Sequence, residues 1–198
     1  MASSSEKEAI MPRPNDTETD LEEVHQLNGL FLDFLRSRVR TGGDCLGLPV
    51  NAARLLGKVP PEHLEAIVAF PTALFRLDLD VLETPRVLDP AADLEDPAKF
   101  ALQHGILHSA RSLCRHRPYA ARLFLGLGDK EIRRLRRMPL NELRELAALP
   151  GILRCAHCES VRLWEGLLSE TRPESRRLLF LLGLQPKLDR ICEAPASA

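Results

Sequence analysis

The sequence predicts an all-α protein that is built from two related helical units. Three observations lead to this class: an internal repeat, apolar residues spaced three and four apart, and an apolar content carried by Leu, Ala and Val. Aromatic residues make up only 5% of the 198-residue chain, whereas 44% of the residues are apolar and 28% are charged. This composition is typical of a globular protein with a packed helical core.

The repeat is the strongest of these observations. Residues 45–76 and 124–155 align without a gap at a spacing of 79 residues, and ten of the 32 aligned positions are identical. A period of this length does not suit a solenoid unit and favours two related domains. The identical pairs are Leu46/Leu125, Gly47/Gly126, Leu48/Leu127, Arg54/Arg133, Leu56/Leu135, Pro60/Pro139, Leu64/Leu143, Ala69/Ala148, Pro71/Pro150 and Leu74/Leu153.

The first unit is expected over residues 21–81. It follows an N-terminal tail, residues 1–20, that is rich in Ser, Glu and Pro and is predicted to be disordered. Apolar residues at helical spacing predict a first helix from Leu21 to Val39, ended by two glycines. Pro49 and Pro60 each precede a shorter helix, and residues 74–79 alternate like a short extended segment.

Residues 82–97 are predicted to be an acidic, Pro-containing linker. The second unit is expected over residues 98–192, with a frayed tail at 193–198. Its first helix is expected from Ala98 to Arg117, and the second copy of the repeat core follows. Two further helices are expected at residues 160–169 and 174–182.

The strongest chemical signal lies at residues 121–138, which fit the frame of a helix-turn-helix. In this frame a small residue of the first helix, a glycine at the turn and two apolar residues pack the second helix on the first. Arg122 departs from the frame, because a second small residue is preferred at its position. The residues that fit are Ala121, Gly126, Ile132 and Leu135.

The same region is strongly basic. Residues 111–137 contain nine Arg and Lys residues against two acids, a local charge of +7, which is typical of a phosphate-binding surface. The alternative is a solvated face that pairs with the acidic linker or the N-terminus. The candidate DNA-binding residues are Lys130, Arg133 and Arg134 on the groove-facing side, and Arg136 and Arg137 near phosphates.

The first repeat carries only Arg54 and Lys58 on the equivalent helix, so it is interpreted as a scaffold or partner surface.

The cysteines and histidines do not predict a metal site or an enzyme. Cys155 and Cys158 form a single Cys-x-x-Cys, whereas structural zinc usually needs two such pairs, so core or helix-end cysteines are favoured over zinc. His104 and His108 are spaced i, i+4 without the Glu of a metalloprotease motif. No Gly-rich phosphate loop, nucleophile elbow or paired-carboxylate motif occurs. We therefore expect no catalytic activity, no metal and no cofactor.

No run of 18 apolar residues occurs, and the N-terminus lacks the apolar core of a signal peptide. Five cysteines in a chain of this size do not form a disulfide framework. The sequence therefore predicts a cytoplasmic protein with reduced thiols and no membrane span.

Each unit resembles the flagellar transcriptional activator subunit FlhD. The likeness lies in a long first helix, a Leu-Gly-Leu turn before a short helix, and a second helix led by proline. These features are Leu46-Gly47-Leu48 with Pro60-Pro61, and Leu125-Gly126-Leu127 with Pro139. Phe75-Arg76-Leu77-Asp78 adds to the likeness in the first unit, and the resemblance covers about residues 22–80 and 100–192.

The resemblance implies an all-α, mostly dimeric regulator that works with a partner subunit, FlhC, to activate flagellar operons. The usual subunit of that family is a single unit, whereas this chain carries two. We therefore expect two FlhD-like units with helix-turn-helix-like cores, packed through their first helices as an intramolecular pseudo-dimer; a further oligomer stays open. The inter-subunit cysteine of the family falls at Ala73 and Ile152, which argues against a disulfide-linked dimer.

The predicted function is a transcriptional regulator of the FlhD type that acts with an FlhC-like partner protein at promoter DNA, in flagellar or motility gene control. The alternative is a helical interaction adaptor or secretion-associated regulator that does not bind DNA. The net charge of −1 and the weakly basic first repeat favour this alternative.

Overall fold

The computed structural model describes residues 14–80 and 96–169. Helices make up 70% of the described residues, and the remaining regular structure there is two three-residue strands. The predicted helical class is thus confirmed in its coarse form. Residues 82–95 of the expected linker, the helix expected at 174–182 and the frayed tail at 193–198 lie outside the described residues. The last two residues of the expected linker, Asp96 and Pro97, instead cap and begin a helix.

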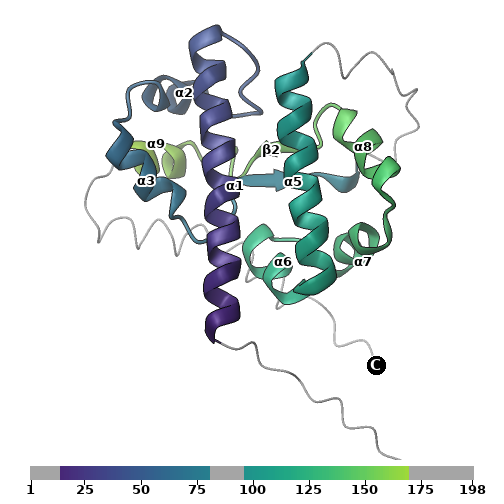
Figure 1. Ribbon diagram of the computed structural model, residues 1–198. Helices are drawn as coiled ribbons and strands as arrows, with labels where there is room; N and C mark the ends of the chain where they lie inside the picture. The colour runs from purple at the N-terminus through teal and green to yellow at the C-terminus, as the bar shows by residue number, and fades with distance from the viewer. Residues whose placement is uncertain (1–13, 81–95, 170–198) are drawn as a thin grey trace, which may run out of the picture.

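Two long helices, α1 and α5, stand side by side and run antiparallel in the middle of the molecule (Figure 1). α1 spans Pro14–Thr41 and α5 spans Pro97–His116. An ion pair joins them at each end. Asp20 near the start of α1 contacts Arg117, which follows the last residue of α5, and Arg38 near the end of α1 contacts Asp96, the N-cap of α5.

α1 is longer than expected, because it begins at Pro14 and not at Leu21. Residues 14–20, which were expected to belong to a disordered tail, are helical. This stretch makes a long-range contact: Asp20 is only 6% exposed and pairs with Arg117 of the other half. Such a contact leaves no trace in the local periodicity.

The first half continues with α2 (Val50–Leu56), α3 (Pro61–Val68) and β1 (Phe75–Leu77). Proline precedes α2 and opens α3, where its missing N–H removes no helical hydrogen bond. The connection from α3 to β1 is held by Asn28 of α1, which is fully buried. Its side chain donates to three carbonyls and accepts from the Leu74 amide at 2.9 Å; the carbonyls belong to Val68, Phe70 and Thr72.

The second half repeats this order with two added helices, one after α5 and one after the strand. The elements are α6 (Pro118–Leu125), α7 (Asp129–Arg137), α8 (Leu140–Ala148), β2 (Leu153–Cys155) and α9 (Val161–Ser169). At the spacing of 79 residues, α7 corresponds to α2 and α8 corresponds to α3. α5 packs on α7 and α8 as α1 packs on α2 and α3.

The glycine of each Leu-Gly-Leu segment has a left-handed backbone, although Leu125 before it is the last residue of α6 and Leu46 itself has a φ angle of 54°. Gly47 and Gly126 have φ angles of 81° and 68°, in the left-handed region where a residue without Cβ is favoured. Gly126 thereby ends α6, and its amide N–H donates to the Arg122 carbonyl at 3.1 Å. The identity of this glycine between the repeats thus has a backbone reason.

The two halves also meet through backbone and through α9. β1 and β2 form an antiparallel pair in which Arg76 lies opposite Arg154. After β2 the chain crosses over, and α9 packs on α2 and α3 of the first half (Figure 1). Trp164 of α9 is 1% exposed and donates from Nε1 to the Ala156 carbonyl at 2.7 Å. Side chains from both halves therefore share one continuous apolar core.

Candidate nucleic-acid interface

α6 and α7 are joined by a short turn, residues 126–128, in a helix-turn-helix arrangement. Three residues of the predicted frame, Ala121, Ile132 and Leu135, are at most 5% exposed. Gly126 supplies the left-handed turn. The frame residues therefore occupy the places that pack α7 on α6, and the rest of α7 is left to face outward.

Four of the five candidate residues on α7 are exposed. Because Ile132 and Leu135 face the core, residues on the opposite side of a 3.6-residue turn point to solvent. Arg136 lies nearer to α5, since its carbonyl accepts from Arg115. The exposed candidates are Lys130, Arg133, Arg136 and Arg137.

Arg134 differs from these four. It is half-buried, and its Nη1 donates to the carbonyl oxygen of Leu79 at 3.2 Å. Leu79 belongs to the first half and is 1% exposed. This guanidinium therefore makes a contact within the chain that joins the two halves, and replacing it would disturb that contact.

Arg111 and Arg115 of α5 bind the C-terminal end of α7. The Nε of Arg111 donates to the Met138 carbonyl at 2.8 Å, and the Nε of Arg115 donates to the Arg136 carbonyl at 3.2 Å. The last carbonyls of a helix have no partner within the helix and carry partial negative charge. These two arginines thus stabilise the end of α7.

Arg117 and Arg122 are paired with carboxylates. Arg117 contacts Asp20 of α1, and Arg122 contacts Asp129 at the start of α7. Together with Arg111, Arg115 and Arg134, at least five of the nine bases between residues 111 and 137 make contacts within the chain. The count of charges along the sequence therefore overstates the basic surface that a nucleic acid could reach.

The start of α7 is acidic. Asp129 and Glu131 lie in its first turn, and the Glu131 carboxylate accepts from the Gly128 amide. Negative charge at this end stabilises the helix, because the N-terminal amides carry partial positive charge. It also repels phosphate, so contacts of α7 with a nucleic-acid backbone would come from its later turns.

The equivalent helix of the first half, α2, is much less basic. Arg54 of this helix and Lys58, which follows its end, are exposed. The positions equivalent to Lys130 and Arg136 are Asn51 and Gly57. Of these two equivalent helices, α7 is therefore the one that suits an interface with a nucleic acid.

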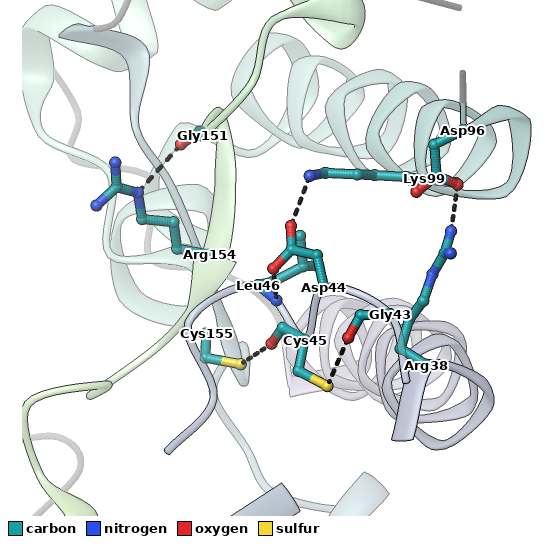
Figure 2. Close-up of polar contacts among 10 residues, drawn as sticks. All are labelled: Arg38, Gly43, Asp44, Cys45, Leu46, Asp96, Lys99, Gly151, Arg154 and Cys155. Carbon is teal, nitrogen blue, oxygen red and sulfur yellow. Dashed lines mark hydrogen bonds and ion pairs between the residues drawn. The ribbon is translucent and has the colours of Figure 1, made fainter. Parts of the chain in front are cut away.

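Two buried cysteines, Cys155 of β2 and Cys114 of α5, are poorly suited to reaction. Cys155 is 2% exposed, and its thiol lies 3.6 Å from the Cys45 carbonyl (Figure 2). Burial raises the pKa of the Cys155 thiol, with a further contribution from Cys158, and burial raises the pKa of Cys114 to about 12. Among the described residues, no group of three His, Cys, Asp or Glu side chains is arranged to hold a metal ion.

Figure 2 shows the polar contacts that close the end of the α1–α5 pair. Lys99 donates to the Asp44 carboxylate at 2.7 Å, while the Leu46 amide donates to the other oxygen of Asp44 at 2.9 Å. Burial alone would raise the pKa of Asp44. The hydrogen bonds from Lys99 and Leu46, with the positive charges of Lys99 and Arg38, outweigh burial and hold the pKa below its ordinary value.

Comparisons with protein-family models, with curated proteins and with solved structures find no match for this chain. None of the helices in the described ranges combines the length and apolar character needed to cross a membrane.

Proposed function

We propose that this protein is a cytoplasmic transcriptional regulator of the FlhD type, in which the exposed cations of α7 meet promoter DNA. The observation that carries the proposal is the position of these cations. Lys130, Arg133, Arg136 and Arg137 are exposed on the second helix of a helix-turn-helix arrangement, which is the helix that enters the major groove in proteins of this kind.

In this proposal the two units form an intramolecular pseudo-dimer. Its support is the antiparallel contact of α1 with α5 and the pairing of β1 with β2. Fusing two units in one chain gives an effective concentration of order mM, so the pair does not depend on protein concentration.

One basic helix supplies a small interface. A specific protein–DNA interface of a single module buries roughly 600–1,000 Å² of protein surface, and α7 has only nine residues. We therefore expect weak binding by the chain alone. An FlhC-like partner protein would supply further contacts with DNA. The targets would be flagellar or motility promoters.

The proposal is tested with Arg133→Ala/Arg136→Ala in the full-length chain. Both side chains are exposed, so their removal should leave the fold unchanged, which circular dichroism can verify. Arg134 is kept because of its contact with Leu79. Binding to a random-sequence DNA duplex is measured by fluorescence anisotropy over a series of salt concentrations. The variant should bind DNA more weakly. The negative slope of the log association constant against log salt concentration should become shallower by about 2.

The first repeat provides a matched control. Arg54→Ala/Lys58→Ala removes one exposed cation from the equivalent helix and one that directly follows it, so it should leave the affinity and the salt slope unchanged. If both double variants lowered the DNA affinity equally, DNA would be attracted by the total charge of the protein and not by a surface on α7. No effect of Arg133→Ala/Arg136→Ala would exclude this surface.

A protein-interaction adaptor that does not bind DNA is the second candidate. It is favoured by the arginine contacts within the chain, since Arg111, Arg115, Arg117, Arg122 and Arg134 are already engaged. Under this function, the full-length chain does not bind DNA at low salt.

A further inference from the structure

In the first half, α9 packs against the helix pair α2–α3. His63 of α3 is 7% exposed, and its Nε2 donates to the Leu167 carbonyl of α9 at 3.1 Å. The apolar side of α9 is buried. Its buried residues are Leu163, Trp164, Leu167 and Leu168.

The equivalent helix pair, α7–α8, has a groove in the corresponding place. Glu142 takes the position of His63, and it lines this groove, which has a volume of about 470 Å³. α9 packs on the first half, and no other helix among the described residues packs on this groove. The remaining lining residues are Arg134, Arg137, Met138, Pro139, Glu145, Leu146 and Leu149.

The floor of the groove is apolar in both halves, but the rim differs. The floor pairs are Val59/Met138, Ile67/Leu146 and Phe70/Leu149. In the first half, the rim positions hold two apolar residues, a lysine and a histidine. In the second half, they hold two arginines on α7 and two glutamates on α8. The rim pairs are Leu55/Arg134, Lys58/Arg137, His63/Glu142 and Ala66/Glu145.

We infer that the α7–α8 groove docks an amphipathic helix of a partner protein, with an apolar stripe like that of α9, acidic residues along one edge and basic residues along the other. The repeat shows that such a helix fits this pair of helices, and apolar anchors in a groove are a common mode of helix recognition. Acids would face Arg137, because Arg134 is held by the Leu79 carbonyl, and bases would face Glu142 and Glu145.

The rim selects against α9 itself as the occupant, including α9 of a second copy. In the first half His63 donates to a backbone carbonyl of α9. A carboxylate at the same position, Glu142, accepts and does not donate, so that carbonyl would face negative charge. A basic side chain from the bound helix would suit Glu142 better.

This inference names a partner surface for the regulator proposed above and rests on that proposal for its setting. Its test uses full-length protein and fluorescent peptides of about 18 residues, long enough to form a helix. Two peptides share the apolar stripe of α9. One carries Glu along one edge and Lys along the other, and the second carries Gln along both edges. The mixed-charge peptide should bind about tenfold more tightly than the Gln peptide.

Glu142→Lys/Glu145→Lys makes the whole rim basic, and both side chains are exposed. This variant should lose most of the affinity for the mixed-charge peptide and gain affinity for a peptide with Glu on both edges. Glu62→Lys/Glu65→Lys makes the same change on exposed positions of α3 and should behave like the unchanged protein.

Absence of binding by all the peptides would overturn the inference, as expected if another part of the chain or a second copy fills the groove. Equal effects of the two charge-reversal variants would also overturn it. The peptide assay contains no DNA, and its variants leave Arg133 and Arg136 in place. If the unchanged protein bound DNA but none of the peptides, this result would therefore count against the docking inference alone and not against the proposed function.

Discussion

His63 and Leu167 are 104 residues apart, yet the imidazole of the first donates to the carbonyl of the second at 3.1 Å. This hydrogen bond fastens α9, which follows the second repeat, to α3 of the first repeat. The stability of the first half thus depends on a helix that lies nearly a hundred residues further along the chain.

His63→Ala should lower the free energy of unfolding by roughly 2 kcal/mol. The substitution removes a buried side chain and leaves the Leu167 carbonyl without its donor. Urea denaturation followed by tryptophan fluorescence measures this change, because Trp164 of α9 is the one tryptophan of the chain. His108→Ala, at an exposed position of α5, is the control and should stay within about 0.5 kcal/mol. Equal stability of the two variants would contradict the role of His63.

Asn28→Leu should destabilise the protein by about 3 kcal/mol or more. Leucine has a similar size, but it leaves the Phe70 and Thr72 carbonyls and the Leu74 amide unpaired in the core. Chemical denaturation monitored by circular dichroism measures the loss. Asn28→Asp keeps the acceptor for Leu74 but loses the donors and buries a charge, so it should be at least as damaging. If the Asn28→Leu variant unfolded cooperatively with unchanged stability, these hydrogen bonds would add little to the free energy of unfolding.

Asp20→Asn should weaken the contact between α1 and the α5–α6 junction. The variant leaves the Arg117 guanidinium without its carboxylate, and Asp20 is almost fully buried. Because Arg117 keeps partial access to solvent, the expected loss is roughly 2 kcal/mol, less than for a fully buried pair. Asp33→Asn on an exposed position of α1 is the control. Thermal unfolding compares the two, and the midpoint should fall only for Asp20→Asn.

Asp44→Asn should make stability less dependent on acid pH. The folded state holds the pKa of Asp44 below its ordinary value, so its stabilisation is present above the ordinary pKa and is lost as pH falls through the lower folded-state pKa. The side chain is 57% exposed, which limits the effect to less than about 1 kcal/mol. Unfolding midpoints of variant and unchanged protein should differ at pH 6 and converge below about pH 3. A constant difference across this range would exclude Asp44 as the titrating group.

Helices that begin at proline and turns that need glycine could be predicted from the sequence. Pro49, Pro60 and Pro139 precede α2, α3 and α8, and the glycines shared by the repeats adopt left-handed backbone. These features follow from the conformational limits of single residues, so they are visible in a local stretch of sequence. The spacing of apolar residues likewise located the core side of α7 at Ile132 and Leu135.

The partners of each surface could not be predicted in this way. Apolar spacing shows which side of α9 is buried, but only the tertiary structure shows that this side packs on the first half. Arg134 and Arg133 are neighbours of the same charge, yet one donates to Leu79 and the other is exposed. The strand β2 also depends on a partner, since an isolated three-residue strand has no hydrogen-bonded neighbour without β1.

The sequence by itself determined the repeat, most of the helices and the concentration of basic residues around α7. The tertiary structure decided which cations remain exposed, that α9 packs on the first helix pair and not on the second, and that Asp20 pairs with Arg117 of the other half. The physical reason is the range of the interactions. Backbone preference and periodicity act over a few residues, whereas ion pairs, helix-end contacts and groove packing join residues that only the fold brings together.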